Sequence, residues 1–189
     1  MKTRFIVSAL LATSIALPAM AADNQEMVME ARKVIKQFAT QLKSELKAAM
    51  KEGGPVNAIS VCNEKAPEIT EQVSTSSGWT VARTSLKPRS TANVPLPWER
   101  RVMEEFEARK AAGADPKTLD YSDVVEENGK KVFRYMKAIP TAKVCLNCHG
   151  GEQVKPEVEM RLKSLYPSDR ARGFQEGDLR GAFVVEKAF

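Results

Sequence analysis

Several features are scarce in this sequence of 189 residues, and each scarcity excludes a class of protein. It contains one histidine, so no metal site can draw two imidazole ligands from the same chain. Lysine and arginine number 29 against 24 aspartates and glutamates, too small an excess for the basic surface of a nucleic-acid-binding protein. There is no internal repeat or low-complexity tract, which excludes repeat architectures.

Hydrophobic runs long enough to span a membrane are also missing. The apolar stretch 5–17 follows the basic residues Lys2 and Arg4, and small residues follow it. This order is typical of a secretory signal peptide, and the small residues predict cleavage after Ala21 or Ala22. We therefore expect a periplasmic mature protein without stable insertion in the membrane.

The chain beyond the predicted signal peptide (residues 1–22) has the composition of an ordinary globular protein. Hydrophobic residues make up 43% of the sequence and charged residues 28%. The length suffices for one hydrophobic core and is short for two. We therefore predict a single domain, residues 23–189.

Cysteine is scarce too: three are present, an odd number for an oxidising compartment, where cysteines usually pair. Two of them belong to the segment Cys145-Leu146-Asn147-Cys148-His149, which also contains the single histidine. The C-x-x-C-H spacing is the attachment motif for c-type haem. Each thiol forms a thioether with one haem vinyl group, and the imidazole becomes the proximal ligand of iron. The motif predicts one covalently bound haem c.

Three other interpretations of the motif are possible. A thioredoxin-like dithiol follows a buried strand and opens a long helix, whereas this motif is preceded by Pro140 and followed by Gly150-Gly151. A zinc site is disfavoured because adjacent Cys148 and His149 could hardly both reach one tetrahedral ion. A chance pentapeptide with a structural disulfide is the third. The zinc site would have to use all the available ligands, namely Cys62, Cys145, Cys148 and His149.

A second axial ligand for the iron has several candidates in the sequence. Cys62 is left over once the motif has used the other thiols, and it lies on the apolar face of a predicted helix. From its position alone, a buried inert cysteine and an iron ligand remain equally open. A thiolate ligand would lower the reduction potential of the iron. The other candidates are water, lysines, and the methionines Met27, Met29, Met50, Met103, Met136 and Met160.

The N-terminal half predicts two consecutive helices. Asp23-Asn24 can cap a helix whose apolar residues recur with a period of 3.6 as far as Ala49. Gly53-Gly54-Pro55 ends that helix and Pro55 suits the first turn of the next. The second helix extends to Ser76, and Pro67 predicts a kink or restart near Ala66.

The C-terminal half predicts antiparallel strands with short helices between them. The dipeptide Asn128-Gly129 between two alternating segments is the strongest hairpin signal in the chain. Helices first and antiparallel strands later imply the α+β class. The predicted strands are 79–85, 120–127, 130–138 and 182–185, and the predicted helices are 97–111 and 156–166.

Beyond the haem motif, an ordered set of segments resembles a known family. Those segments are Ala58–Pro67, Arg83–Lys87, Ala92–Pro95, Trp98-Glu99, Cys145–His149 and Gly173–Gly181. Together they are similar to a bacterial family of c-type haem-binding domains of unknown function with a PAS-like sensor fold. The resemblance extends from Met27 to Val185, and one departure is visible. Arg89-Ser90-Thr91 stands where the family has an Arg-Asn-Pro run.

The resemblance implies more about the fold and the site than the motif alone. It implies a PAS-like antiparallel sheet with a long N-terminal helix, helices on one side, and haem bound against the sheet. In that family the cysteine that matches Cys62 is the second axial ligand, opposite the histidine that matches His149. Family members often carry signalling domains, so the output of this chain is expected to pass through a partner protein.

These observations favour a redox or small-ligand sensor as the function. Iron(II) holds thiolate less well than iron(III), so reduction, nitric oxide or carbon monoxide would release Cys62 and shift its helix. A periplasmic electron-transfer cytochrome is the alternative. We expect no enzyme and no catalytic residue, because no second histidine is present to act as acid or base. Candidate partners for the haem propionates are Arg83, Lys87, Arg89 and Lys143, each more commonly an ordinary surface charge.

Overall fold

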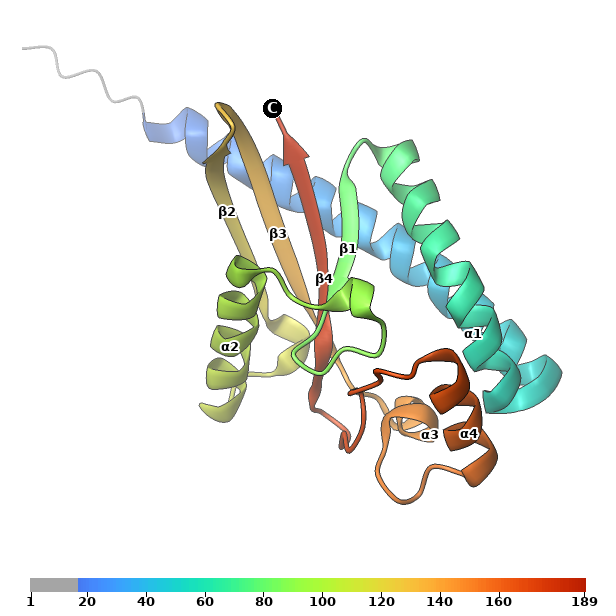
Figure 1. Cartoon of the computed structure of the whole chain (residues 1–189). Coiled ribbons are helices and arrows are strands. Elements are labelled where there is room, and N and C mark those ends of the chain that lie inside the picture. Colours follow the sequence, from blue (N-terminus) through green and yellow to red (C-terminus); the bar gives the residue numbers. More distant parts are fainter. Residues whose placement is uncertain (1–16) are drawn as a thin grey trace, which may run out of the picture.

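The structure is a computed structural model that describes residues 17–189, so most of the predicted signal peptide lies outside the described residues. Its centre is a four-stranded antiparallel sheet with the strand order β1-β4-β3-β2 (Figure 1). The strands are β1 (Thr80–Thr84), β2 (Asp120–Glu127), β3 (Lys130–Pro140) and β4 (Leu179–Ala188). The helices are α1 (Leu17–Ser77), α2 (Pro97–Ala111), α3 (Leu146–His149) and α4 (Pro156–Leu165). Short 3-10 turns are η1 (Thr91–Asn93), η2 (Pro116–Thr118) and η3 (Lys143–Cys145).

Helix α1 consists of two arms that meet at a sharp break. Gly53 and Gly54 have non-helical backbone angles, and Gly54 has φ 68° and ψ −162°, a region open to glycine alone. The Asn57 side chain donates a hydrogen bond of 3.2 Å to the Ala49 carbonyl, which would otherwise lack a partner at the helix end. The first arm (17–52) therefore ends here, and the second arm (55–77) returns beside it (Figure 1).

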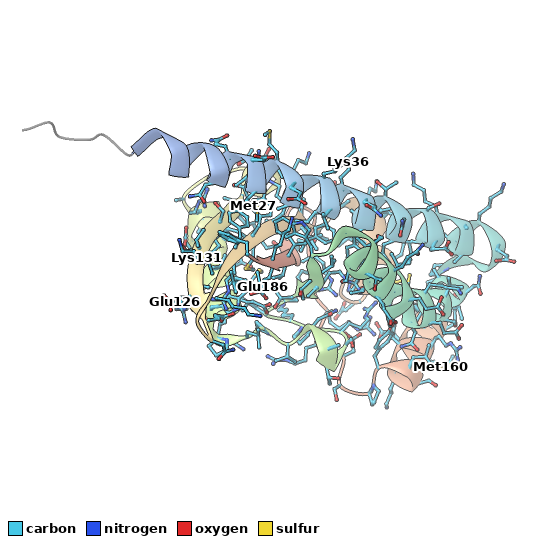
Figure 2. All side chains as sticks on the ribbon, turned by 90° about the horizontal axis from the view of Figure 1, so that it is seen from above. Met27, Lys36, Glu126, Lys131, Met160 and Glu186 are labelled. Carbon is cyan, nitrogen blue, oxygen red and sulfur yellow. The ribbon has the colours of Figure 1, made fainter. Side chains whose placement is uncertain are left out.

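The first arm of α1 covers one face of the sheet. Its apolar stripe, including Ala31, Ile35 and Phe38, packs on Phe133 and Tyr135 of β3. Seen from above, Met27 points toward the sheet, while Lys36 points into solvent (Figure 2). The 3.6-residue period of the sequence thus places its apolar face where the sheet needs cover. The same core cluster includes Val34, Ile69, Val73, Trp79, Val81 and Val185.

Helix α2 covers the opposite face of the sheet, where Val102, Met103 and Phe106 pack on Met136 and Val184. The expectation of helices on one side only is therefore wrong. Successive side chains of a strand point to opposite faces, so β3 and β4, both apolar on each face, need cover on both. The α+β class, the antiparallel sheet and the long N-terminal helix are confirmed, and the arrangement is consistent with a PAS-like fold.

Most predicted elements are present, with three differences. The backbone stays helical through Pro67, so no restart occurs near Ala66. Helix α1 already begins at Leu17, and β4 extends well beyond both ends of the predicted 182–185. The hairpin turn is as predicted, because Asn128 and Gly129 both have positive φ (53° and 75°). Within residues 17–189, no helix combines the length and apolar character that crossing a membrane requires.

The segment between β3 and β4 forms a small helical unit at the end of the sheet. A third apolar cluster joins Ile59 of the second arm to Val158 and Leu162 of α4. Cys148 and Tyr166 pack at its edge. This cluster fixes the C-x-x-C-H motif against the second arm of α1, and α3 lies at the opposite end of the sheet from the β2–β3 turn (Figure 1).

Candidate functional site

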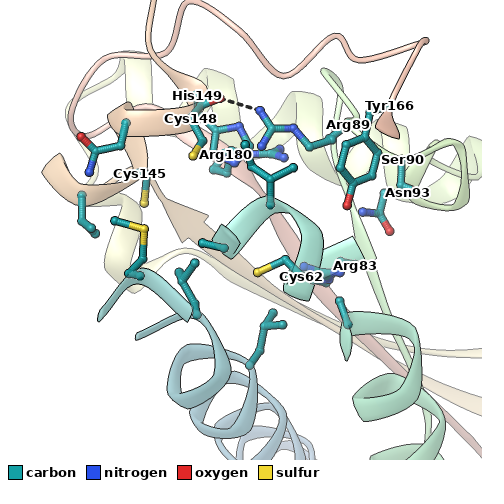
Figure 3. Close-up of a pocket in the computed structure, with 18 residues that line it drawn as sticks. Cys62, Arg83, Arg89, Ser90, Asn93, Cys145, Cys148, His149, Tyr166 and Arg180 are labelled. Atoms are coloured by element: carbon teal, nitrogen blue, oxygen red, sulfur yellow. Dashed lines mark hydrogen bonds between the residues drawn. The ribbon is translucent and has the colours of Figure 1, made fainter. Parts of the chain in front are cut away.

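A pocket lies between the two arms of α1, the end of the sheet and the helical unit that carries α3. It encloses about 1000 Å³ of space, its open mouth included. Cys62, Cys145, Cys148 and His149 all line this pocket (Figure 3). The fold thus brings Cys62 next to the motif, although the two lie more than 80 positions apart in the sequence.

The motif itself occupies a single helical turn. Cys145 ends η3, and Cys148 and His149 lie in α3, so their i, i+3 and i+4 spacing places all three side chains on one side. Gly150 ends the turn, and its N–H donates to the Leu146 carbonyl. The Phe174 N–H donates a hydrogen bond of 3.0 Å to the His149 carbonyl, and the Gly173 N–H donates one of 2.9 Å to the Gly150 carbonyl. Backbone hydrogen bonds from residues 173–174 therefore fix the position of the motif.

The tautomer of His149 follows from its two hydrogen-bond partners. Nδ1 lies 3.0 Å from the Ala171 carbonyl oxygen, which can only accept, so Nδ1 carries the proton. Nε2 lies 3.3 Å from Nε of Arg180, which can only donate, so Nε2 holds the free lone pair. Burial, followed by the charges of Arg180 and Arg89, holds the pKa of His149 well below its ordinary value. The imidazole is therefore neutral and presents a lone pair to the pocket.

Cys62 projects from the second arm of α1 into the pocket, below His149 in the view of Figure 3. Its side chain is partly buried, and burial raises the pKa of the thiol. All three cysteines lie within the described residues and none of them forms a disulfide. The side chain is thus available as a ligand and is a thiol at neutral pH in this state.

The charge of the pocket has one sign. Arg83, Arg89 and Arg180 line it, and no aspartate or glutamate of the described residues does. Arg89 forms an ion pair of 3.1 Å with Asp169. Within residues 17–189, Arg83 and Arg180 have no carboxylate partner. Burial, then the charges of Arg89 and Arg83, lowers the pKa of Arg180 to about 10, which shows how poorly its charge is compensated.

Apolar side chains from both arms of α1 form the remaining wall. Met50 is the one candidate methionine that lines the pocket. Met103 and Met136 belong to the core under α2, and Met29 and Met160 are exposed. Of the predicted propionate partners, Arg83 and Arg89 line the pocket, whereas Lys87 and Lys143 do not. The apolar lining consists of Leu42, Leu46, Met50, Ala58, Ile59, Ala66 and Val144.

The lining matches the chemistry of haem c. A porphyrin is a large apolar disc with two carboxylates, and this pocket combines an apolar wall with three arginines. It also holds the paired thiols and a neutral imidazole whose lone pair faces inward. The described residues contain no group of three or more His, Cys, Asp or Glu side chains close enough to hold a metal ion directly.

Sequence reasoning missed several residues that shape the site. Arg180, Asn93 and Tyr166 line the pocket, and Ala171 sets the tautomer of His149. Arg180 lies in the segment Gly173–Gly181 that carries the family resemblance, which was the one signal that pointed to it. Contacts through a backbone carbonyl such as that of Ala171 leave no trace in the residue type.

The chain is similar to known proteins in both sequence and structure. The family model described as Tll0287-like matches residues 16–187. The crystal structure of the cyanobacterial haem protein Tll0287 is similar over 90% of this chain and 95% of that chain, with a TM-score of 0.60 and 22% sequence identity. No curated protein sequence matches. At this identity the structural likeness supports the fold.

Proposed function

Because this chain belongs to the Tll0287-like family, we propose that it is a cytochrome-like protein that binds one haem c covalently. The similar cyanobacterial protein is described as a haem protein, which supports the proposal. The proposal depends on one observation: two motif thiols, a neutral imidazole and three arginines line the same pocket, and no aspartate or glutamate of the described residues lines it.

Each pocket residue has a defined role in this proposal. Cys145 and Cys148 form the thioethers, and His149 binds iron through Nε2 while Ala171 holds its Nδ1–H. Cys62 would hold the iron as its second protein ligand. When bound, the haem iron supplies one-electron redox chemistry and a binding position for diatomic gases. Arg180 must give up its contact with Nε2 of His149 before that atom can bind a metal.

A redox or gas-sensing role is favoured by where Cys62 lies. It sits on the second arm of α1, beyond the Gly53–Gly54 break, so that arm is joined to the first by non-helical backbone. Loss of the Cys62–iron bond would free this arm to move relative to the first, which is the kind of two-state element a sensor needs. An electron-transfer cytochrome, in which Cys62 stays bound, is the alternative.

The proposed address is the periplasm, after removal of residues 1–22 as a signal peptide. The thioether attachment suits an exported protein because it prevents loss of the cofactor. The signal would pass to a partner protein, or an electron to a redox partner, and neither nucleic acid nor stable membrane insertion is part of the proposal.

Covalent attachment is tested by mass. The full chain, produced together with a c-type haem attachment system, is expected to have the mass of one haem added to the processed polypeptide. Replacing both Cys145 and Cys148 by alanine should abolish this addition. Cys62→Ala is the matched control, since it removes a thiol from the same pocket and should keep the covalent haem. A colourless wild-type protein with the bare mass would refute the proposal.

Carbon monoxide binding distinguishes a sensor from an electron-transfer cytochrome. If Cys62 is displaceable, the dithionite-reduced protein should bind the gas with a shift of its main absorption band, and Cys62→Ser should bind it more readily. A reduced spectrum that carbon monoxide leaves unchanged in the wild type would establish the carrier instead.

A further inference from the structure

We propose that Arg83 anchors the haem propionates, with Asn93 and Tyr166 completing a carboxylate-binding subsite at the end of the pocket farthest from the motif thiols. This inference rests on the proposed haem binding. It assigns an orientation to the cofactor and a role to residues that the C-x-x-C-H motif does not define.

The orientation follows from the covalent structure of haem. Its two vinyl groups and its two propionates lie on opposite edges of the porphyrin ring, so fixing one edge fixes the direction of the other. Cys145 and Cys148 fix the vinyl edge. In Figure 3 these thiols lie on one side of the pocket, and Arg83, Asn93 and Tyr166 lie on the other. The propionates therefore point toward Arg83.

Of the three arginines that line the pocket, Arg83 alone has a side chain without a hydrogen bond or ion pair to the described residues. Arg89 is paired with Asp169 and also donates to the Cys148 carbonyl. Arg180 donates to His149 and, over 3.2 Å, to the Ser85 hydroxyl.

Within residues 17–189, the side chain of Arg83 forms no ion pair and no hydrogen bond. Its Cζ atom lies 5.7 Å from the centroid of the Phe38 ring. Removing a guanidinium group from water without a neighbouring anion costs free energy, and a bound carboxylate would offset that cost at this position. A guanidinium group can also bind a carboxylate through two parallel hydrogen bonds.

A second cavity gives the propionates room at this end. It shares Cys62, Arg83, Asn93 and Tyr166 with the first pocket and continues along β1 to Thr70 on the second arm. Including its open mouth, it encloses about 930 Å³. Its one acidic lining residue among those described is Glu71, which is exposed. The amide of Asn93 and the hydroxyl of Tyr166 add donors beside the guanidinium group.

The test uses the haem-loaded protein and two spectroscopic and electrochemical readouts. Arg83→Gln removes the charge while keeping most of the side-chain length. It should retain covalent haem by mass, shift the propionate bending band in resonance Raman spectra, and lower the reduction potential, because a cation near iron disfavours iron(III). Lys87→Gln is the control. It removes the same charge from an exposed side chain outside the pocket, where solvent screens it, and should change neither readout.

The outcomes separate this inference from the proposed function. A wild-type chain without haem would refute both the proposed function and the role of Arg83. A loaded Arg83→Gln protein with an unchanged propionate band would overturn the role of Arg83 and leave haem binding intact. Should Arg83→Gln fail to accumulate, Arg83→Lys decides, because lysine keeps the charge and lacks the two-pronged geometry. The band must then shift while the potential stays near the wild-type value, and an unshifted band would again overturn the assignment.

Discussion

At the scale of single residues, the site depends on how two nitrogens of one imidazole are used. The Ala171 carbonyl takes the Nδ1 proton, which leaves Nε2 as the only atom of His149 that can bind a metal. Arg180 occupies that lone pair in the haem-free chain. In the proposed haem-bound state, iron would replace the guanidinium group of Arg180 at this one atom.

Replacing Cys62 by serine tests its assignment as axial ligand. Cys62→Ser should retain covalent haem, since Cys145 and Cys148 are untouched, while a hydroxyl is a far weaker ligand for iron(III) than a thiolate. The oxidised protein should change from a low-spin to a high-spin absorption spectrum. Ser60→Ala, on the same helical arm and outside the pocket lining, serves as the control. An oxidised spectrum identical to that of the wild type would remove Cys62 from the coordination sphere.

The depressed pKa of His149 predicts a pH dependence for the haem-free chain. A histidine whose folded pKa lies below its unfolded value of 6.5 binds its proton more readily when the chain is unfolded. The free energy of unfolding should therefore fall as the pH drops below about 6.5. Urea unfolding at several pH values would measure this in a Cys145→Ala, Cys148→Ala chain, and adding His149→Gln should flatten the curve between pH 6.5 and 5. The same slope in both chains would contradict the prediction.

At the scale of elements, the break in α1 decides where Cys62 lies. The two arms contribute opposite parts of the apolar pocket wall, including Leu46 before the break and Ile59 after it. The angle between the arms is set by Gly53 and Gly54, whose backbone conformations end one helix and start the next. A change in this short segment alters the position of every side chain on the second arm.

Substitution of Gly54 tests this dependence. Alanine at φ 68° and ψ −162° is strained, so Gly54→Ala should reduce the free energy of unfolding by about 1–3 kcal/mol. In the haem-loaded protein it should also raise the high-spin fraction of the oxidised spectrum by displacing Cys62. Lys51→Ala, an exposed helical position just before the break, should have little effect on either measurement. Full stability of the Gly54→Ala protein in urea would mean that the break does not need glycine.

A polar cluster joins the first arm of α1 to the sheet. Asp120 accepts hydrogen bonds of 2.7 Å from both Arg32 and Tyr135. Burial alone would raise the pKa of Asp120, but these hydrogen bonds and the charge of Lys137 hold it below its ordinary value of 3.8. The cluster therefore stabilises the fold above pH 4 and loses its effect as the pH falls below that value.

Asp120→Asn isolates this contribution. It should lower the free energy of unfolding by about 1 kcal/mol at pH 7, a modest value because Arg32 is largely exposed. The difference from the wild type should shrink once the pH falls below 3.8 and should disappear only below the lower folded pKa of Asp120, where the carboxyl is protonated in both states. Glu126→Gln, an exposed carboxylate on the same strand, is the control for general charge effects. A constant difference between pH 7 and pH 3 would show that the charge of Asp120 is irrelevant.

At the scale of the whole molecule, the sequence predicts local features well and long-range ones poorly. The Asn128-Gly129 turn, the glycine break in α1 and the Pro97 helix start all follow from backbone preferences that act within a few residues. The placement of α2 on the second face does not, because it depends on which apolar surfaces of β3 and β4 are left uncovered.

In the candidate site, too, residues close together in the sequence could be predicted and residues brought together by long-range contacts could not. The sequence could predict that Cys145, Cys148 and His149 act together, because they lie within five residues of one another, and all three line the pocket. Arg83 and Arg180 lie on adjacent strands, β1 and β4, and become neighbours of the motif only through strand pairing and the loop that follows α4. The absence of an acidic partner for them among residues 17–189 is a property of the folded pocket, and no spacing in the sequence encodes it.

The contact between Arg180 and His149 has a consequence for the order of events in the cell. In the folded chain a guanidinium group lies against Nε2 of His149, the atom to which the proposed function assigns the iron, and the strand that carries Arg180 is paired on both sides. If haem is attached as proposed, folding that is completed first would therefore oppose binding of the iron by His149. Conditions or variants that delay closure of β4 should raise the proportion of coloured protein.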